Sequence, residues 1–358
     1  MEPLDPEVMV RQVEALTSDL RDLTPRYAQR IDNLLTVAEW AAVDRVYLTG
    51  DGDSYHASCA AEMAFEAIGG VDCEPSSALR FAHYTTPWMR PTPARRTLVI
   101  ATSASGATQR VVHAIERAKQ RGALTLALTG TPATPVTKAA HRALIVDLPE
   151  TEPSPGIRTY QASLLGLLLI AIHLSETRRE NPHPAAQALR QELAELADPL
   201  EATTRAVKNP CRELAATIAD APVILMLGSG PSYGTALYSA AKIIEASGVF
   251  AAGQDLEEWS HVERFAYPDN TPVFVIAPPG RSHQRAADLA AQAHQLGRHV
   301  IAITHHHDTQ ITPHTHTLLP VPGHTREEFS PLLYHPFTSY LGSYLARQLG
   351  RQPFQTDR

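Results

Sequence analysis

Short apolar runs alternate with amphipathic stretches along most of the chain. Continuous apolar runs typical of buried strands lie at residues 45–50, 96–103, 123–130 and 142–149. Apolar residues recur at helical spacing over residues 54–68, 107–121 and 160–177. Strands that are apolar throughout are typical of parallel sheets covered on both faces by helices. The pattern therefore predicts an α/β fold built on doubly wound parallel sheets.

The chain before the first predicted strand is expected to be helical. Apolar residues recur at helical spacing from Val8 to Leu20, and Pro25 is expected to break the helix. A charged, alanine-rich stretch at residues 178–203 is predicted to connect two domains and to include a solvent-exposed helix. The predicted division is an N-terminal helical segment (1–41), a first domain (42–180), a connecting helix (181–204) and a second domain (205–358).

Two stretches of the chain repeat in the same order. Residues 222–236 echo residues 45–58, and both place Gly-x-Gly-x-Ser-Tyr between a strand and a helix. Residues 272–305 echo residues 97–130 at nearly the same offset, with Gln284 in the place of Gln109. A repeat of this length is too long for a solenoid. It predicts two homologous domains.

Composition narrows the class of protein. With 44% hydrophobic and 19% charged residues, the chain has enough apolar material for two cores. A formal net charge of −7 argues against a nucleic-acid-binding protein, which normally carries a basic patch. The longest apolar run, Leu164 to Ile172, is about half of the ~18–20 residues of a membrane span. No membrane segment is therefore expected.

The cysteines and the N-terminus indicate the compartment. Cys59, Cys73 and Cys211 are odd in number and show no CxxC spacing, which disfavours a disulfide framework or a thiolate metal site. The acidic start MEPLDPEVMV has no apolar core and does not resemble a signal peptide. We expect a cytoplasmic protein.

The segment SASGAT, Ser103 to Thr108, follows a predicted strand and opens a helix. Backbone N–H groups and the helix dipole at such a position favour an anion, and Gly106 lets the backbone approach it closely. Ser103, Ser105 and Thr108 add hydroxyl donors. A simple N-capping turn is the alternative. The second copy reads PPGRSH at residues 278–283, with prolines that remove donors, so phosphate binding is predicted for the first copy alone.

The Gly-x-Gly-x-Ser-Tyr motif lacks the third glycine of a dinucleotide-binding fingerprint. It is interpreted as a tight strand-to-helix turn. Ser54 belongs to the half that has SASGAT and is a candidate for the same phosphate, with Gly52 and Asp53 beside it.

A third candidate is the pair Lys242 and Glu245, which lie three residues apart on one helical face, followed by His261. A surface ion pair is the ordinary explanation of such a pair. Together with the histidine, however, the region offers a carboxylate base and an imidazole acid or base, which aldose–ketose proton transfer requires.

With these motifs, the chain resembles the SIS (sugar isomerase) family from about residue 40 to its end. The resemblance is greatest to the isomerase half of glutamine–fructose-6-phosphate aminotransferases and to related deaminases and fructosamine-6-phosphate deglycases. It implies that Ser103, Ser105 and Thr108 hold a sugar phosphate with Ser54 nearby. No N-terminal cysteine nucleophile and no glutamine-hydrolysing domain like those of the aminotransferases are expected.

The resemblance also implies the catalytic roles. Glu245 is expected to move a proton between C1 and C2 of the sugar, and Lys242 to lie close to the reacting carbons. His261 is expected to open the sugar ring from a neighbouring subunit, which implies a homodimer with shared sites.

The chain departs from the family pattern at several positions. Ala104 and Ala107 stand where the family loop carries an amide and a carboxylate, and Asp53 replaces a threonine. The family's tail lysine is replaced by Arg358, which stays protonated and cannot form a Schiff base. These departures argue against amino-sugar synthesis. They leave isomerisation or deamination.

Two further groups were weighed as site residues. His305 to His307 with Asp308, His314 and His316 resemble a metal cluster, but adjacent histidines cannot all point one way, so no metal is expected. Arg158 and Thr159 match a family segment that lines the sugar pocket, although a helix start explains them equally well. The remaining sugar-contact candidates are Gly52, Asp53, Ala104, Gly106 and Arg358.

These observations predict an SIS-type enzyme that acts on an aminosugar phosphate or fructosamine phosphate. A plain aldose–ketose phosphosugar isomerase uses the same residues and remains an alternative. A non-catalytic sugar-phosphate sensor is a third hypothesis, against which the presence of Glu245 and His261 counts. No cofactor, nucleic acid or membrane partner is expected.

Overall fold

The computed structural model describes residues 4–89, 97–178 and 182–355. The chain forms two compact units. The N-terminal unit comprises Ser18–Glu150 and Thr159–Glu195, and the C-terminal unit comprises Met1–Thr17, Thr151–Arg158 and Leu196–Arg358. The N-terminal helical residues are thus divided between the two units.

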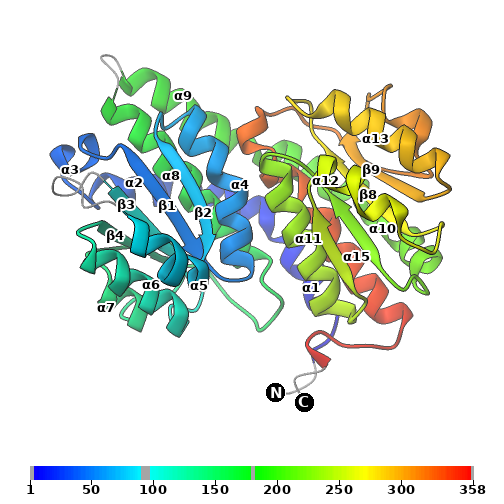
Figure 1. Cartoon of the computed structure of the whole chain (residues 1–358), viewed down its shortest axis with the longest axis horizontal. Coiled ribbons are helices and arrows are strands. Elements are labelled where there is room, and N and C mark those ends of the chain that lie inside the picture. The colour runs from blue at the N-terminus through cyan, green and yellow to red at the C-terminus, as the bar shows by residue number, and fades with distance from the viewer. Residues whose placement is uncertain (1–3, 90–96, 179–181, 356–358) are drawn as a thin grey trace. The chain divides into compact units, whose positions relative to one another are not determined.

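The N-terminal unit contains a five-stranded parallel sheet in the order β2-β1-β3-β4-β5 (Figure 1). Its central strands β1, β3 and β4 are almost wholly buried, as their continuous apolar sequences predict. The strands are β1 (Arg45–Gly50), β2 (Asp72–Ser77), β3 (Thr97–Thr102), β4 (Leu124–Thr129) and β5 (Arg142–Ile145).

The long apolar helix α8 (Arg158–Arg178) lies in the core of this unit, where every residue from 160 to 172 is buried. A helix that is apolar all round requires such surroundings. The other helices are α2 (Leu16–Asp32), α3 (Val37–Ala41), α4 (Asp53–Ala67), α5 (Ala78–Arg80), η1 (Phe81–Thr85), η2 (Thr86–Trp88), α6 (Gln109–Gln120), α7 (Pro135–Ala139) and α9 (Pro182–Glu195).

The C-terminal unit contains a second five-stranded parallel sheet in the order β10-β9-β8-β6-β7, of which Figure 1 labels β8 and β9. In both sheets the first strand lies between the second and the third, so the predicted duplication is confirmed in the topology. The strands are β6 (Ile224–Leu227), β7 (Ala251–Gln254), β8 (Pro272–Ala277), β9 (His299–His305) and β10 (Thr317–Val321).

Helices flank this sheet as well, among them two long ones, α10 and α15, which pack against each other. Among the described residues, no helix of either unit is long and apolar enough to cross a membrane. The helices of this unit are α1 (Glu7–Glu14), α10 (Ala197–Ile218), α11 (Pro231–Ser247), α12 (Leu256–His261), η3 (Glu263–Phe265), α13 (His283–Gln295), η4 (Thr312–His314), η5 (Glu327–Phe329), α14 (Pro331–Tyr334) and α15 (Pro336–Gln348).

The duplication extends to the backbone conformation of the first turn. Gly52 precedes α4 with φ 54° and ψ −130°, and Gly230 precedes α11 with φ 57° and ψ −133°. Residues with a Cβ atom disfavour this conformation, which explains why glycine stands at both positions. The motif is a strand-to-helix turn in both units.

The predicted break at Pro25 is wrong. Helix α2 continues through Pro25, and the interruption lies instead at Ala15, between α1 and α2. Proline removes one helical N–H, and the hydroxyl of the neighbouring Thr24 donates to the carbonyl of Leu20 at 2.6 Å. The helix continues although Pro25 leaves one backbone hydrogen bond unmade.

Candidate functional site

The loops after β1 and β3 diverge at the carboxyl edge of the N-terminal sheet. From β1 the chain proceeds to β2 on one side, and from β3 it proceeds to β4 on the other. Such a switch point is where open α/β sheets bind ligands. The turn at Gly52, which leads into Ser54 at the start of α4, follows β1, and the loop 103–108 follows β3. The fold therefore brings these two predicted segments to the same edge of the sheet.

Gly50 permits the close approach of the two loops. A Cβ at this position would lie 2.7 Å from the Cβ of Ser54 and 2.9 Å from the carbonyl oxygen of Thr102. Both distances are shorter than real contacts allow. Ser54, buried at the start of α4, therefore lies directly beside the end of β3.

The loop 103–108 is a tight turn lined with hydroxyl groups. The Gly106 N–H donates to the Ser103 carbonyl at 3.0 Å, and the hydroxyls of Ser103 and Thr108 are 3.1 Å apart. Ser105 Oγ accepts from the Ala107 N–H at 3.3 Å. Gly106 has φ +68°, and a Cβ there would lie 2.3 Å from Thr134 Oγ1. Only glycine fits this position without a shift.

The loop leads into helix α6, whose N-terminus carries the positive end of a helix dipole. Thr108 is the N-cap residue, and its side chain makes no capping hydrogen bond. The first turn of α6 contains no acidic residue. Hydroxyls and a helix N-terminus without a carboxylate can together hold a phosphate group.

Asp53 and Ala104, which are predicted sugar contacts beside this loop, make contacts within the chain. Asp53 Oδ1 lies 3.8 Å from His56 Nδ1. Burial, with the charge of Asp53 adding to it, raises the pKa of Tyr160, so this phenol stays protonated. The Ala104 carbonyl accepts from the Gly130 N–H at 3.1 Å, which anchors the loop to the end of β4.

Arg158 and Thr159 begin helix α8, as the sequence predicts for a helix start. Arg158 is buried, and its charge helps to lower the pKa of Glu152, although the hydrogen bond from Arg11 is the larger cause. Thr159 is partly exposed. The last sugar-contact candidate, Arg358, lies outside the described residues.

The corresponding loop of the C-terminal unit, residues 278–283, has a carboxylate of the chain itself against it. The Arg281 N–H lies 3.2 Å from both Glu327 Oε1 and Oε2. A Cβ at Gly280 would lie 2.5 Å from Glu327 Cδ. The second loop is thus closed by Glu327, which the sequence analysis did not identify.

Lys242 and Glu245 form an ion pair on helix α11. The Lys242 side chain is completely buried, whereas that of Glu245 is 28% exposed. A buried ammonium needs a partner, and here the carboxylate of Glu245 supplies one. The pair is therefore not the surface ion pair of the alternative interpretation.

A pocket of about 490 Å³ lies beside Glu245, and its second wall is the turn that follows α15. The Phe354 N–H donates to the Glu245 carbonyl at 2.8 Å, and Arg351 Nη1 donates to the Ser247 carbonyl at 2.8 Å. The lining residues are Ile244, Glu245, Ser247, Gly248, Arg351, Gln352, Phe354 and Gln355. Except for Glu245, these lining residues are not among the predicted site residues, although Gly350 and Pro353 indicate a turn there.

His261 is the last residue of α12, and its side chain is 67% exposed. Its Nε2 lies 3.1 Å from Glu257 Oε1, and the other oxygen of Glu257 is 2.6 Å from Arg285 Nε. His261 does not belong to the residues that line the pocket at Glu245. Within the described chain, the structure therefore does not bring these two predicted residues into one pocket.

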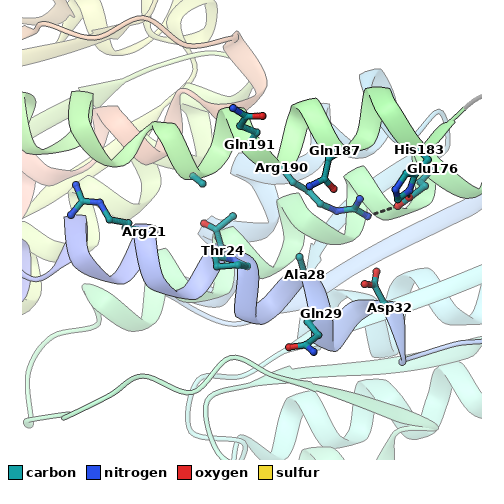
Figure 2. Close-up of a pocket in the computed structure, with 12 residues that line it drawn as sticks. Arg21, Thr24, Ala28, Gln29, Asp32, Glu176, His183, Gln187, Arg190 and Gln191 are labelled. Carbon is teal, nitrogen blue, oxygen red and sulfur yellow. Dashed lines mark hydrogen bonds and ion pairs between the residues drawn. The ribbon is translucent and has the colours of Figure 1, made fainter.

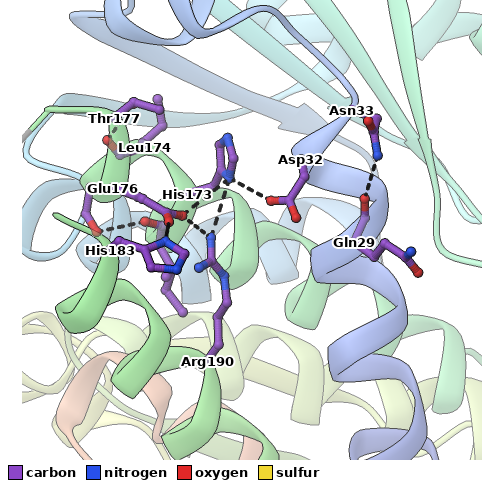
Figure 3. A network of polar contacts seen from close by, with 11 residues as sticks. Gln29, Asp32, Asn33, His173, Leu174, Glu176, Thr177, His183 and Arg190 are labelled. Carbon is purple, nitrogen blue, oxygen red and sulfur yellow. Dashed lines mark hydrogen bonds and ion pairs between the residues drawn. The ribbon is translucent and has the colours of Figure 1, made fainter.

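Another pocket, of about 430 Å³, lies between facing sides of α2 and α9 (Figure 2). None of the predicted site residues lines it. A polar network includes residues that line this pocket: Glu176 pairs with both Arg190 and His183, and His173 Nδ1 lies 3.3 Å from Asp32 Oδ1 (Figure 3). Burial lowers the pKa of His173. The network connects α8, α9 and α2.

Of the histidines that resemble a metal cluster in the sequence, His305 to His307 lie at the end of β9, whereas His314 lies in η4 and His316 directly before β10. The rings of His305 and His324 are stacked with centroids 4.1 Å apart, and His306 packs on His307. Asp308 instead accepts from Thr304 Oγ1 at 2.7 Å and faces His283 Nε2 at 2.6 Å. Within residues 4–89, 97–178 and 182–355, no three His, Cys, Asp or Glu side chains are arranged to hold a metal.

Comparisons with known proteins identify the family and the fold. The model of the SIS domain family matches residues 41–173 and 217–346. A glutamine–fructose-6-phosphate aminotransferase of Gloeobacter violaceus is 27% identical over 320 residues, which cover 87% of this chain and 50% of the relative. The chain thus spans about half the length of the curated relatives it matches.

Solved structures share the fold. The C-terminal domain of glucosamine-fructose-6-phosphate aminotransferase from Francisella tularensis superposes with a TM-score of 0.84 at 14% identity, covering 97% of both chains. A glucosamine-6-phosphate deaminase from Thermotoga maritima superposes with a TM-score of 0.73 at 17% identity, covering 96% of both chains.

Proposed function

Because the chain belongs to the SIS domain family, we propose that it is a phosphosugar isomerase-type enzyme that releases an amine from an aminosugar phosphate or fructosamine phosphate. The observation that carries the proposal is the difference between its two homologous loops. The loop 103–108 presents hydroxyls at a helix N-terminus, whereas the loop 278–283 is closed by Glu327.

The proposal assigns phosphate binding to the N-terminal unit. Ser103, Ser105 and Thr108 donate hydroxyl hydrogen bonds to the phosphate, and the start of α6 adds backbone N–H groups. Ser54, held beside Thr102 by the close approach at Gly50, contributes from the neighbouring loop. Substitutions in this unit should therefore act mainly on substrate affinity.

Proton transfer is assigned to the C-terminal unit. Glu245 removes a proton from one of the two carbons C1 and C2 and returns it to the other, while Lys242 keeps the carboxylate in its ionised form. The transfer converts the amine-bearing carbon into an imine. Water then adds to the imine carbon, the C–N bond breaks, and the amine leaves with a carbonyl in its place. No electrons are gained or lost, so the reaction needs no redox cofactor.

Ring opening is assigned to His261 acting on the substrate bound by a second copy of the chain. Exposed apolar side chains beside it support such an interface: Val262, Phe265 and Tyr267 are 61%, 65% and 82% exposed. Mixing Glu245→Gln protein with His261→Asn protein should restore part of the activity if the subunits share sites. Absence of any recovery would argue for self-contained subunits.

The experiment that tests the function is incubation of the purified protein with a panel of phosphorylated aminosugars, fructosamines and plain hexoses. Free amine and free ketose or aldose phosphate are measured together. Release of amine from one class supports the proposal and identifies that class. Interconversion of plain hexose phosphates without amine chemistry would replace it with simple isomerisation, and binding without turnover would replace it with a sensor.

A further inference from the structure

Three residues of helix α11 form a row that leads inward from the pocket. Glu245 lines the pocket, Lys242 is one turn away, and Tyr238 is one turn further. This spacing of three and four places all three on one helical face. Exposure falls along the row, because Glu245 is partly exposed whereas Lys242 and Tyr238 are completely buried.

The inner end of the row is covered by helix α15. A Cβ at Gly342 would lie 3.0 Å from the Cβ of Ala246 and 3.2 Å from the carbonyl oxygen of Lys242, so the two helices approach closely there. Thr338 donates to Ser239 Oγ at 2.7 Å in the same interface. The ammonium of Lys242 is therefore held in a water-poor environment, where its partners determine whether it stays charged.

Tyr238 is one of those partners. Lys242 Nζ lies 5.3 Å from the centroid of the Tyr238 ring, which is within the range of a cation–π contact. His335 packs against Tyr238 edge to face, with centroids 5.6 Å apart and planes at 85°. Burial lowers the pKa of His335 to about 3, so this imidazole is neutral and brings no competing charge.

The homologous helix of the N-terminal unit lacks the entire row. Helices α4 and α11 begin with the same turn, and matching Ser54 with Ser232 places Ala60, Ala64 and Ala67 where α11 has Tyr238, Lys242 and Glu245. All three functional groups are present in one copy and all three are alanine in the other. The tyrosine is therefore present only in the copy that has the ion pair.

We propose that Tyr238 is a positioning residue that holds the ammonium of Lys242 against the carboxylate of Glu245. It acts through Lys242 and touches no substrate. The cation–π contact stabilises a charged Lys242, and the charged lysine in turn stabilises the ionised, base-active form of Glu245. The inference rests on the proposed role of Glu245 and adds to it the group that keeps the base ready.

The aromatic, titratable and charged groups around Lys242 and Glu245 come from three elements. Tyr238 lies on α11 itself, His335 comes from the junction of α14 and α15, and Arg351 comes from the turn that lines the same pocket. His335 stays neutral well below the working pH range, and Arg351 stays charged throughout it. Lys242 is thus the group whose charge responds to the loss of the tyrosine ring.

The test measures the titration of Glu245 without any substrate. The full chain is labelled with carbon-13 at the glutamate carboxyl, and the Glu245 signal is assigned by its absence in Glu245→Gln. Lys242→Met should move the titration midpoint up by about 1 to 3 pH units, since an opposite charge is lost. Tyr238→Leu should move it in the same direction by a smaller amount, and Tyr238→Phe should leave it near the wild-type value because the ring face remains.

The double variant makes the test decisive. If Tyr238 acts through Lys242, Tyr238→Leu should produce no further shift in the Lys242→Met background. Phe337→Leu is the matched control, because Phe337 is a buried aromatic residue of the same unit, stacked on Phe274 at 5.9 Å, outside the row. It should lower thermal stability and leave the midpoint unchanged.

Two outcomes would overturn the inference: an unchanged midpoint in folded Tyr238→Leu, or equal shifts in the presence and absence of Lys242. Because the readout needs no turnover, it stands apart from the substrate panel. A protein that is inactive on the whole panel could still show the coupled titration, and an active one could lack it.

Discussion

The two units of this chain have the same sheet order and the same opening turn, but they differ in what each adds to that scaffold. The N-terminal unit presents the hydroxyl-lined loop 103–108 and carries alanines along α4. The C-terminal unit places a lysine and a glutamate on α11 and closes its own loop with Glu327. Under the proposed function, binding and chemistry could be optimised separately after duplication, because each needs only one copy.

The largest effect on activity is expected at Glu245, to which the proposed function assigns proton transfer. Glu245→Gln should lower kcat by about 10²- to 10⁴-fold, since a positioned base is lost, and leave KM for the sugar phosphate nearly unchanged. Steady-state kinetics on the substrate found by the panel measures both. The control is Glu66→Gln on α4, beside the alanine that matches Glu245. A near-normal rate in Glu245→Gln would remove the proposed role of this residue.

The second-largest effect is expected on the affinity for sugar phosphate, and only for substitutions in the N-terminal unit. Gly106→Ala places a Cβ against Thr134 in a loop with positive φ, and we expect sugar-phosphate affinity to fall by about 10- to 100-fold. Gly280→Ala is the counterpart in the second loop and should leave affinity unchanged. Calorimetric titration of both variants with a non-reacting sugar phosphate measures the difference. Equal losses in the two would contradict the division of labour.

The two units should also differ in acid sensitivity. His335 is fully buried and its pKa is about 3, whereas burial lowers the pKa of His173 against the opposing effect of the carboxylates Asp32 and Glu176. A histidine with a depressed pKa makes the native state lose stability as pH falls through the unfolded value of about 6.5. Denaturant unfolding at pH 7 and pH 5 should show that His335→Gln removes about 1 to 2 kcal/mol of this acid destabilisation.

His173→Gln should remove less of it, since neighbouring carboxylates favour the protonated ring. Equal responses of the two variants to acid would contradict this expected difference between the units.

The smallest effect concerns the closed loop. Glu327→Gln removes the charge that faces the Arg281 N–H but keeps the shape of the side chain, so the free energy of unfolding should fall by about 1 kcal/mol. Affinity for sugar phosphate at the first loop should not change. Thermal unfolding and the same calorimetric titration test both statements. A large change in affinity would show that the second loop takes part in binding.

Most of the fold could be predicted from the sequence, but three of the four edge strands could not. The predicted strands lie in the apolar runs of β1, β3, β4 and β5, but β2, β7 and β10 were not predicted. All three are edge strands. Pro75 lies in β2, Gly253 in β7 and Pro320 in β10, and a sheet edge tolerates such residues because one side needs no partner.

The candidate site shows the same limit. The loop 103–108 and the pair Lys242–Glu245 could be found because each is local in the sequence. Glu327 and the turn at Gly350–Gln355 could not, because their importance comes from contacts with residues far away along the chain. Periodicity and motif spacing carry no information about such contacts.

The turn after α15 has a practical consequence for anyone handling the protein. The Phe354 N–H and the Arg351 guanidinium donate hydrogen bonds that attach this turn to helix α11. The turn lines the pocket and is not part of either sheet. A carboxypeptidase that trimmed these residues would open the pocket while leaving the two folded units in place. With the role proposed for Glu245, such trimming should lower activity more than thermal stability, so intact mass is the quality control to apply.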